Sequence, residues 1–344
     1  MIIDCTGLTA AYLADLRALY KAAWQEELID CISSYVLSKD DPLSFTTSGS
    51  TGTPQEIHRS RAMVVQSAAR TIKSFALEQV TSALLCLPIR YIAGRMMIYR
   101  AIEYGWTLYC IEPRIAPSID SSWQIDFSAC IPLQVEKLIA KDSIDQIKKM
   151  IIGGSRISHD LRVTISGIST ICYETYGMTE TLTHVAARRV KEEVSFVALD
   201  GVKFSLGDNN VLVIQDPICG TFATTDVIQL HSDTSFTLLG RTDRIINMGG
   251  LKIHPEELEQ KIEPFMKCSY FIAKERHSEL DSVPVLYVEC EEDALRVQAH
   301  LSERTQRPRR FYKVKMKYTV SEKLITRPEA YPEAQEICQL KSDK

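Results

Sequence analysis

Residues 46–55 read Thr-Thr-Ser-Gly-Ser-Thr-Gly-Thr-Pro-Gln, and a segment with helical periodicity begins near Ser60. Glycines let backbone N–H groups turn toward a ligand, Ser and Thr add hydroxyl donors, and a helix start adds a partial positive charge. This combination favours a polyphosphate-binding loop. Its candidate contacts are Thr47, Ser48, Gly49, Ser50, Thr51 and Gly52. The Lys-Ser or Lys-Thr pair that closes the P-loop of common nucleotide hydrolases is absent here, and a Ser/Thr-rich linker is the alternative.

The composition is that of an ordinary globular protein. Of the 344 residues, 45% are hydrophobic and 24% are charged, and the formal net charge is −4. A negative net charge argues against a nucleic-acid partner, and it means that local cations, backbone donors and a metal must hold any triphosphate. Because no apolar run reaches about 18 residues and the N-terminus lacks a basic-then-apolar leader, we expect no membrane insertion and a cytoplasmic location.

The cysteines give no metal-binding pattern. Ten are present, at positions 5, 31, 86, 110, 130, 172, 219, 268, 290 and 338, and none forms a C-x-x-C pair. Zinc binding is therefore disfavoured. Most of the cysteines lie in apolar runs, so we interpret them as reduced core residues.

The order of apolar and helix-patterned segments predicts the fold class. Strand-like runs cover residues 83–87, 106–111, 150–152 and 168–173, and helical patterns cover residues 63–77, 94–103 and 135–140. Strands alternating with helices indicate an α/β fold with a doubly wound sheet. Residues 194–239 instead predict a small antiparallel β unit, and the segment after residue 243 predicts a separate α+β unit.

Two later segments extend the pattern of the hydroxyl-rich loop. Residues 176–180 read Tyr-Gly-Met-Thr-Glu after an apolar run, and residues 240–244 read Gly-Arg-Thr-Asp-Arg shortly before the pair Gly249 and Gly250. In this order and at these separations, the three segments resemble the adenylate-forming superfamily. That group holds acyl-CoA synthetases, peptide-synthetase adenylation domains and firefly luciferases. The resemblance covers roughly residues 43–327.

The resemblance implies two domains. An AMP-binding domain of residues 1–242 would have a truncated N-terminal subdomain, because relatives carry a longer segment before the phosphate loop. A small mobile domain of residues 243–344 would swing on it. Within the superfamily, the chain most resembles the compact o-succinylbenzoate–CoA ligases of the menaquinone pathway.

The resemblance also implies a two-step reaction. ATP and Mg²⁺ would convert a carboxylic acid to an acyl-adenylate, and coenzyme A would then displace AMP. The first step brings two anions together, so cations and backbone donors must offset their repulsion. Lys323 occupies the position of the family's catalytic lysine, Thr179 would donate to the α-phosphate, and Glu180 would be the Mg²⁺ ligand. The structural alternative is a helix that Thr179 caps and Glu180 begins.

Further nucleotide contacts follow from the same resemblance. The adenine would meet Gly153, Gly154 and Ser155 together with Tyr176 and Gly177. Asp226 would accept hydrogen bonds from the ribose hydroxyls, and Arg241 would contact the ribose and the phosphates. Gly249 and Gly250 would let the pantetheine arm pass, and ordinary turns are the alternative for both glycine pairs.

o-Succinylbenzoate has two carboxylates, so the one that is not activated needs a buried cation. His184 and Arg188 are four residues apart and would share one face of the helix begun at Glu180, with Arg188 as the carboxylate clamp. An exposed arginine beside Arg189 is the alternative. Tyr91 takes the place of the family's usual histidine and would line the acyl pocket.

Two departures from the family pattern bear on activity. Gln55 stands where relatives usually place a lysine, and Glu322 replaces the usual glycine before Lys323. The alternatives are therefore another acyl- or aryl-CoA synthetase, a stand-alone adenylation enzyme, or a homologue that binds nucleotide without catalysis. The sequence leaves open whether the chain forms a homodimer.

Overall fold

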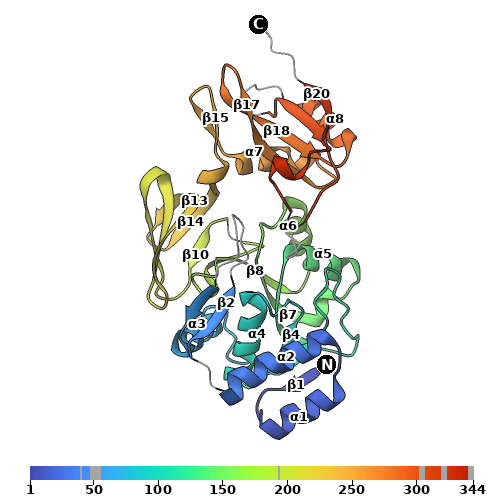
Figure 1. Ribbon diagram of the computed structural model, residues 1–344, viewed down its shortest axis with the longest axis vertical. Helices are drawn as coiled ribbons and strands as arrows, with labels where there is room; N and C mark the ends of the chain where they lie inside the picture. Colours follow the sequence, from blue (N-terminus) through green and yellow to red (C-terminus); the bar gives the residue numbers. More distant parts are fainter. Residues whose placement is uncertain (39–40, 47–55, 193, 302–306, 319–323, 340–344) are drawn as a thin grey trace. The chain divides into compact units, whose positions relative to one another are not determined.

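The computed structural model describes the whole chain except residues 39–40, 47–55, 193, 302–306, 319–323 and 340–344 (Figure 1). The described chain divides into two compact units. Unit 1 contains Met1–Phe204, Ile214–Phe222 and Ser232–Ser235, and unit 2 contains Ser205–Val213, Ala223–His231 and Phe236–Lys344. The domain boundary that we predicted after residue 242 stays a prediction.

The centre of unit 1 is a mixed sheet in the order β1-β5-β4-β6-β7-β8-β9-β10. The five strands from β5 to β8 in this order run parallel. β1 is antiparallel to β5, β9 to β8, and β10 to β9. The strands are β1 (Ile2–Asp4), β4 (Ser82–Leu85), β5 (Thr107–Cys110), β6 (Ile125–Cys130), β7 (Ile147–Ile152), β8 (Ile171–Gly177), β9 (His184–Arg189) and β10 (Phe196–Ala198).

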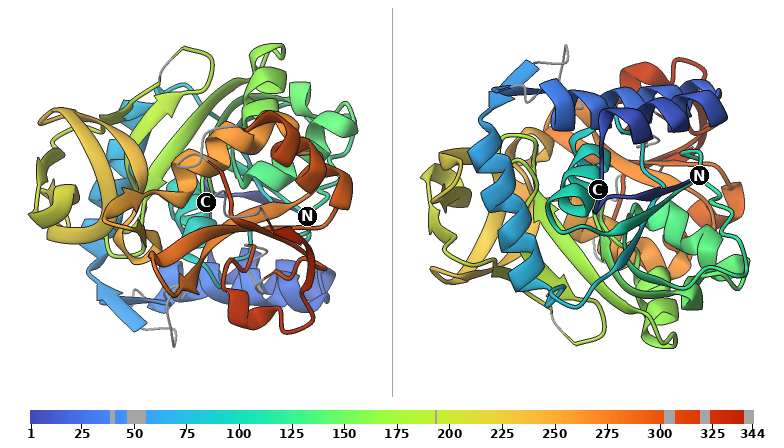
Figure 2. Two further views of the ribbon diagram at one scale, coloured as in Figure 1. Left: turned by 90° about the horizontal axis from the view of Figure 1, so that it is seen from above. Right: turned by 90° about the horizontal axis from the view of Figure 1, so that it is seen from below.

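Helices cover both faces of this sheet, which confirms the doubly wound prediction. Side chains alternate between faces along a strand, so Ala83 and Leu85 join one apolar cluster while Leu84 joins the other. Figure 2 shows the blue helices α1 and α2 on the side opposite the green helices α5 and α6. The helices on the first side are α1 (Ala10–Leu19), α2 (Ala23–Ser33), α3 (Arg61–Ser74) and α4 (Ile92–Glu103), and those on the second are α5 (Pro132–Ala140) and α6 (His159–Ser166).

Directly before α3 lies a pair of strands that the sequence pattern did not predict. β2 (Leu43–Thr46) pairs antiparallel with β3 (Glu56–Arg59), and residues 47–55 between them lie outside the described residues. The helix expected near Ser60 is present, because the Ser60 side chain accepts a hydrogen bond from the Met63 backbone and caps α3. The hydroxyl-rich segment is therefore separated from α3 by a short strand.

The antiparallel β unit predicted for residues 194–239 is also present. Its strands follow one another in the order β14-β13-β12-β11 and contribute residues to both units. They are β11 (Lys203–Leu206), β12 (Val211–Asp216), β13 (Gly220–Ser232) and β14 (Ser235–Arg241).

Unit 2 contains the predicted α+β arrangement. Its sheet has the order β16-β15-β18-β19-β20, with β17 also paired to β18, and α7 and α8 supply Leu258, Ile262 and Val297 to its core. The elements are β15 (Ile246–Met248), β16 (Leu251–Ile253), α7 (Pro255–Ile262), β17 (Tyr270–His277), β18 (Asp281–Val288), α8 (Glu291–His300), β19 (Arg310–Lys313) and β20 (Gln335–Gln339). Every helix among the described residues is too short or too polar to cross a membrane.

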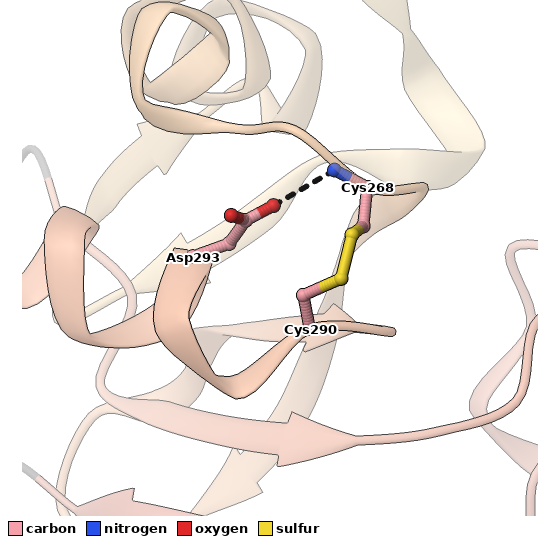
Figure 3. A group of neighbouring side chains, drawn as sticks. All are labelled: Cys268, Cys290 and Asp293. Atoms are coloured by element: carbon pink, nitrogen blue, oxygen red, sulfur yellow. Dashed lines mark hydrogen bonds between the residues drawn. A yellow bond between two sulfur atoms is a disulfide. The ribbon is translucent and has the colours of Figure 1, made fainter.

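A disulfide between Cys268 and Cys290 is an exception to our interpretation that most of the cysteines are reduced core residues (Figure 3). The register of β17 and β18 pairs Tyr270 with Val288, so the residues just outside this pair approach each other, and the two Cα atoms lie 6.0 Å apart. The Asp293 carboxylate accepts a hydrogen bond of 2.8 Å from the Cys268 N–H. Sequence spacing alone carries no information on this register.

Candidate active site

The Tyr-Gly-Met-Thr-Glu motif forms the end of β8 and the turn that follows it. The helix expected to begin at Glu180 is absent, because β8 returns at once as the antiparallel strand β9. Thr181 closes the turn: its hydroxyl accepts from the Met178 N–H at 3.1 Å and donates to the Thr183 carbonyl at 2.8 Å. The prediction of a helix here, and with it the helical face shared by His184 and Arg188, is wrong.

Gly177 allows this sharp return. A Cβ atom at this position would lie 2.3 Å from the Thr183 carbonyl oxygen and 2.5 Å from the His184 Cα, well inside contact distance. Only glycine fits so close an approach of two backbones. The glycine that we assigned to the adenine site therefore has a packing role in the hairpin, whatever ligand lies beside it.

Thr179 and Glu180 are half-buried in the turn, and Arg59 at the end of β3 donates a hydrogen bond of 2.7 Å to the Glu180 carbonyl oxygen. The chain that leaves the hydroxyl-rich segment is thereby tied to the predicted Mg²⁺ ligand. Among the described residues, the Glu180 carboxylate has no ion pair, and a free carboxylate is a good ligand for a hard cation.

Gly153, Gly154 and Ser155 directly follow β7, next to the strand that ends in Tyr176. A Cβ atom on Gly153 would lie 2.8 Å from the Thr175 hydroxyl, and Gly154 has a φ of +88°. Both positions therefore require glycine. Because β7 and β8 are parallel, these residues and Tyr176 share the carboxyl edge of the sheet, where ligands of α/β folds bind.

Arg188 forms an ion pair with Glu174 of the protein itself. It lies on β9, and its Nε and one terminal nitrogen lie 2.8 and 2.7 Å from Glu174 Oε2. Arg162 reaches the same oxygen at 2.6 Å, and the Ile157 N–H donates to the other at 3.2 Å. Arg188 also donates to the Val194 carbonyl. This guanidinium has few donors left for a substrate.

Arg100 was not among the predicted site residues, although its setting is unusual. This residue of α4 is 1% exposed, and within the described residues it has no ion pair. Its Nη2 donates to the Thr183 hydroxyl at 3.2 Å, its Nη1 contacts the Met97 sulfur at 3.6 Å, and its Nε has no partner. Burial lowers the pKa of Arg100 to about 9. The available sequence signal was a single arginine in the apolar helical run of residues 96–102.

His184 is 5% exposed and uses both ring nitrogens within the protein. Nε2 lies 3.0 Å from the Thr71 hydroxyl, and Nδ1 lies 3.1 Å from the Thr183 hydroxyl. Burial, with Arg100 and Arg70 nearby, lowers the pKa of His184 well below its usual value. The direct substrate contact that we predicted for His184 is thus replaced by contacts to two threonines.

Tyr91 precedes α4, and the Arg90 guanidinium carbon lies 4.9 Å from the centre of its ring. Beside it, residues after the carboxyl ends of β4 and β5 line a cavity of about 230 Å³ together with α2. The cavity walls are apolar, with Glu27, Arg90 and Glu112 as charged members. Tyr91 stays a prediction for the acyl pocket.

The predicted residues of unit 2 form two groups. Arg241 lies 3.6 Å from Asp226, and it forms two hydrogen bonds of 3.0 and 3.1 Å with Asp243. Gly249 and Gly250, with φ of +57° and +89°, form the two-residue turn between β15 and β16. Such a turn needs positive φ at both positions, so the alternative of a turn explains both glycines.

Several predicted residues lie outside the described part of the chain. They are Thr47, Ser48, Gly49, Ser50, Thr51, Gly52, Gln55, Glu322 and Lys323.

Comparison with known proteins gives the family of the chain. Residues 15–216 match the family described as AMP-binding enzyme. The 2-succinylbenzoate–CoA ligase of Salmonella typhimurium is 26% identical, and the match covers 83% of this chain and 63% of that protein. The 2-succinylbenzoate–CoA ligase of Listeria monocytogenes is 23% identical, and the match covers 81% of this chain and 65% of that protein. The chain thus spans somewhat less than two thirds of the length of these curated relatives.

Solved structures give the same fold. An acyl-CoA synthetase (AMP-forming)/AMP-acid ligase II-like protein from Dyadobacter fermentans is 28% identical, with a TM-score of 0.63 over 94% of this chain and 97% of the other. The o-succinylbenzoate–CoA synthetase of Bacillus subtilis, in complex with its acyl-adenylate intermediate, is 17% identical. Its TM-score is 0.72, and the match covers 82% of this chain and 67% of the other. Since the matched region covers more than half of the chain and includes the β8–β9 hairpin, the chain belongs to the AMP-binding enzyme family.

Proposed function

We propose that the chain is an ATP- and Mg²⁺-dependent acid–thiol ligase that converts o-succinylbenzoate to its coenzyme A thioester. Family membership and the ligases among its relatives support the reaction type. One observation supports the particular acid: a buried arginine beside the β8–β9 hairpin has no carboxylate partner in the described residues.

Burying a guanidinium without a counterion is costly, because the charge loses its hydration and gains nothing in return. Arg100 bears this cost, and its Nε has no hydrogen-bond partner in the described part of the chain. A carboxylate from a ligand would restore the balance through charge-assisted hydrogen bonds. A substrate with two carboxylates offers one for activation and one for Arg100. Arg188, the clamp that we expected from the sequence, already has Glu174 as its counterion.

In the first step, a carboxylate oxygen attacks the α-phosphorus of ATP, and the bond to the pyrophosphate oxygen breaks. In the second step, the sulfur of coenzyme A attacks the acyl carbon, its proton is lost to solvent, and AMP leaves. Bound Mg²⁺ would offset phosphate charge, and Glu180 is the residue that fits it, since its carboxylate has no cation partner among the described residues.

The other residues in this proposal hold and orient the nucleotide. Thr179 would donate to the α-phosphate, while Gly153, Gly154, Ser155 and Tyr176 would surround the adenine at the carboxyl edge of β7 and β8. Asp226 and Arg241 would contact the ribose. The backbone at Gly250 has open space around it for a pantetheine arm, because a Cβ atom there would meet nothing within 4 Å.

Lys323 would bridge the two reacting anions as a compact positive charge. Lys323→Ala is expected to reduce adenylate formation about 10²- to 10³-fold, the usual loss for one transition-state donor. Thioester formation from preformed adenylate should fall less. Equal losses in both half-reactions would contradict a domain movement that withdraws Lys323 after the first step.

The decisive experiment is pyrophosphate exchange with a panel of acids, followed by thioester formation with coenzyme A. The panel contains o-succinylbenzoate and 4-oxo-4-phenylbutanoate, which keeps only one carboxylate. We expect exchange and thioester formation with the first acid and weak exchange with the second. Turnover of monocarboxylates alone would support the second candidate, a different acyl-CoA synthetase, in line with the name of the Dyadobacter protein. Nucleotide binding without AMP production would identify a non-catalytic homologue.

A further inference from the structure

His184 lies in a chain of hydrogen bonds that connects α3 to α4 through the β8–β9 hairpin. The chain runs from the Ser67 carbonyl to the Thr71 hydroxyl (3.0 Å), then to His184 Nε2 (3.0 Å). On the other side, His184 Nδ1 lies 3.1 Å from the Thr183 hydroxyl, which accepts from Arg100 at 3.2 Å. Ser67, Thr71, His184 and Arg100 are each 5% exposed or less.

With the Thr71 hydroxyl donating to the Ser67 carbonyl, the directions of the other hydrogen bonds in this chain follow from counting protons. The Thr71 hydroxyl has one proton and donates it to the Ser67 carbonyl, so it can only accept from His184. Nε2 of His184 must therefore be protonated, and Nδ1 is left as an acceptor. The Thr183 hydroxyl donates to Nδ1, which leaves its oxygen lone pairs for the N–H of Arg100.

We infer that His184 is a positioning residue: as the neutral Nε2–H tautomer, it fixes the Thr183 hydroxyl so that Arg100 presents its remaining N–H groups to the second carboxylate of the substrate. His184 itself does not touch the substrate. This inference rests on the proposed function for the identity of the anion, but the direction of the hydrogen bonds does not depend on it.

The surrounding charges keep His184 in this state. Arg100 of α4 and Arg70 of α3 both oppose a positive imidazole. Of the two, Arg70 has a counterion among the described residues, Asp216 of β12, at 2.7 Å. A protonated Nδ1 would donate to the Thr183 hydroxyl. That hydroxyl would then accept from both the ring and Arg100, and it would lose the acceptor that fixes its own proton.

The first test reads the tautomer directly. Two-dimensional ¹H–¹⁵N spectra of the histidine side chains in the full chain, with His184→Phe for assignment, should show His184 as the neutral Nε2–H form at pH 7 without any substrate. An Nδ1–H or doubly protonated ring would overturn the inference. This outcome is independent of which acid the enzyme uses.

The second test compares variants that remove or keep one hydroxyl. Thr183→Val should raise KM for o-succinylbenzoate about tenfold, with a smaller change in kcat, whereas KM for 4-oxo-4-phenylbutanoate should change little. Thr183→Ser keeps the hydroxyl and should restore the native KM. Thr170→Val is the matched control, because Thr170 is also buried but donates to the Ile144 carbonyl, away from Arg100.

Two kinetic results would overturn the inference. One is an equal rise in KM for both acids in Thr183→Val, and the other is a loss in Thr183→Ser as large as that in Thr183→Val. If the native chain does not use o-succinylbenzoate at all, the proposed function fails, and the tautomer measurement still decides the role of His184.

Discussion

Two arginines of unit 1, buried Arg100 and half-buried Arg188, differ in whether a carboxylate of the described residues pairs with them. Arg188 shares Glu174 with Arg162, and its nitrogens lie 2.7 and 2.8 Å from one carboxylate oxygen. Arg100 is more deeply buried, yet its contacts in the described residues are a threonine hydroxyl and a methionine sulfur. The first arrangement stabilises the fold by itself, whereas in our proposal a carboxylate of the substrate completes the second. Charge balance therefore separates a structural arginine from a binding arginine.

The largest effect is expected from Arg100→Met. If Arg100 binds the second carboxylate, its loss should lower kcat/KM for o-succinylbenzoate about 10³-fold, equivalent to about 4 kcal/mol. The free energy of unfolding should rise by about 1 to 3 kcal/mol, because an unsatisfied buried charge is removed. Steady-state kinetics with o-succinylbenzoate and 4-oxo-4-phenylbutanoate, together with urea unfolding, measure both. If Arg100→Met is less stable than the native chain and its kcat/KM falls equally for both acids, Arg100 is a structural residue like Arg188.

Glu174→Gln should have the next largest effect, on stability. It leaves the charges of Arg162 and Arg188 without a counterion at a carboxylate that is 4% exposed, so the free energy of unfolding should fall by about 3 kcal/mol. Urea unfolding monitored by circular dichroism checks this. Glu192→Gln is a matched control, since Glu192 pairs with Arg189 at the surface. If the free energy of unfolding falls by a similar amount in both variants, the burial of Glu174 does not increase its contribution to stability.

Arg188→Met should destabilise the chain by about 2 kcal/mol, because it breaks one half of the shared pair and leaves Arg162 with Glu174. Its effects on kcat/KM should be the same for acids with one and with two carboxylates. A selective loss with o-succinylbenzoate would restore Arg188 as the clamp that the sequence suggested, and it would refute the role given to Arg100.

The smallest expected effect is on how the free energy of unfolding changes with pH below pH 7. The pKa of His184 is lowered in the folded chain, so below its ordinary pKa of about 6.5 the unfolded chain binds a proton that the folded chain does not. Stability from this residue is present above that pH and is lost as the pH falls, by up to about 1.4 kcal/mol per unit. His184→Phe should flatten the profile between pH 7 and 5 in urea unfolding, and an unchanged slope would exclude a buried neutral imidazole.

Much of the fold could be predicted from the sequence because strands buried on both faces appear as continuous apolar runs. β4, β5, β7 and β8 were found in this way, and Ser60 marked the start of α3. β9 was missed, since its residues also fit a helical spacing and the return at Gly177 depends on a contact with Thr183 that is remote from any local pattern. The disulfide was missed because it depends on the register of β17 and β18.

The candidate site was predictable to the extent that it consists of contiguous motifs. The turn with Thr179 and Glu180, and the glycines after β7, lie at the expected sheet edge. Arg100 could not be chosen from its motif, because only the packing of α4 against the hairpin shows that no carboxylate of the described residues pairs with it. For the same reason Arg188 was overvalued: its partner Glu174 precedes it by 14 residues and meets it only through strand pairing.

Position 177 also limits how new acid preferences can be engineered into this scaffold. With a backbone oxygen only 2.3 Å from where a side chain would begin, nineteen of the twenty amino acids are unusable there. A mutagenesis library should leave this codon unchanged and place its diversity on α4 instead, at positions other than Gly94, where a Cβ atom would lie 2.5 Å from the Pro88 carbonyl oxygen.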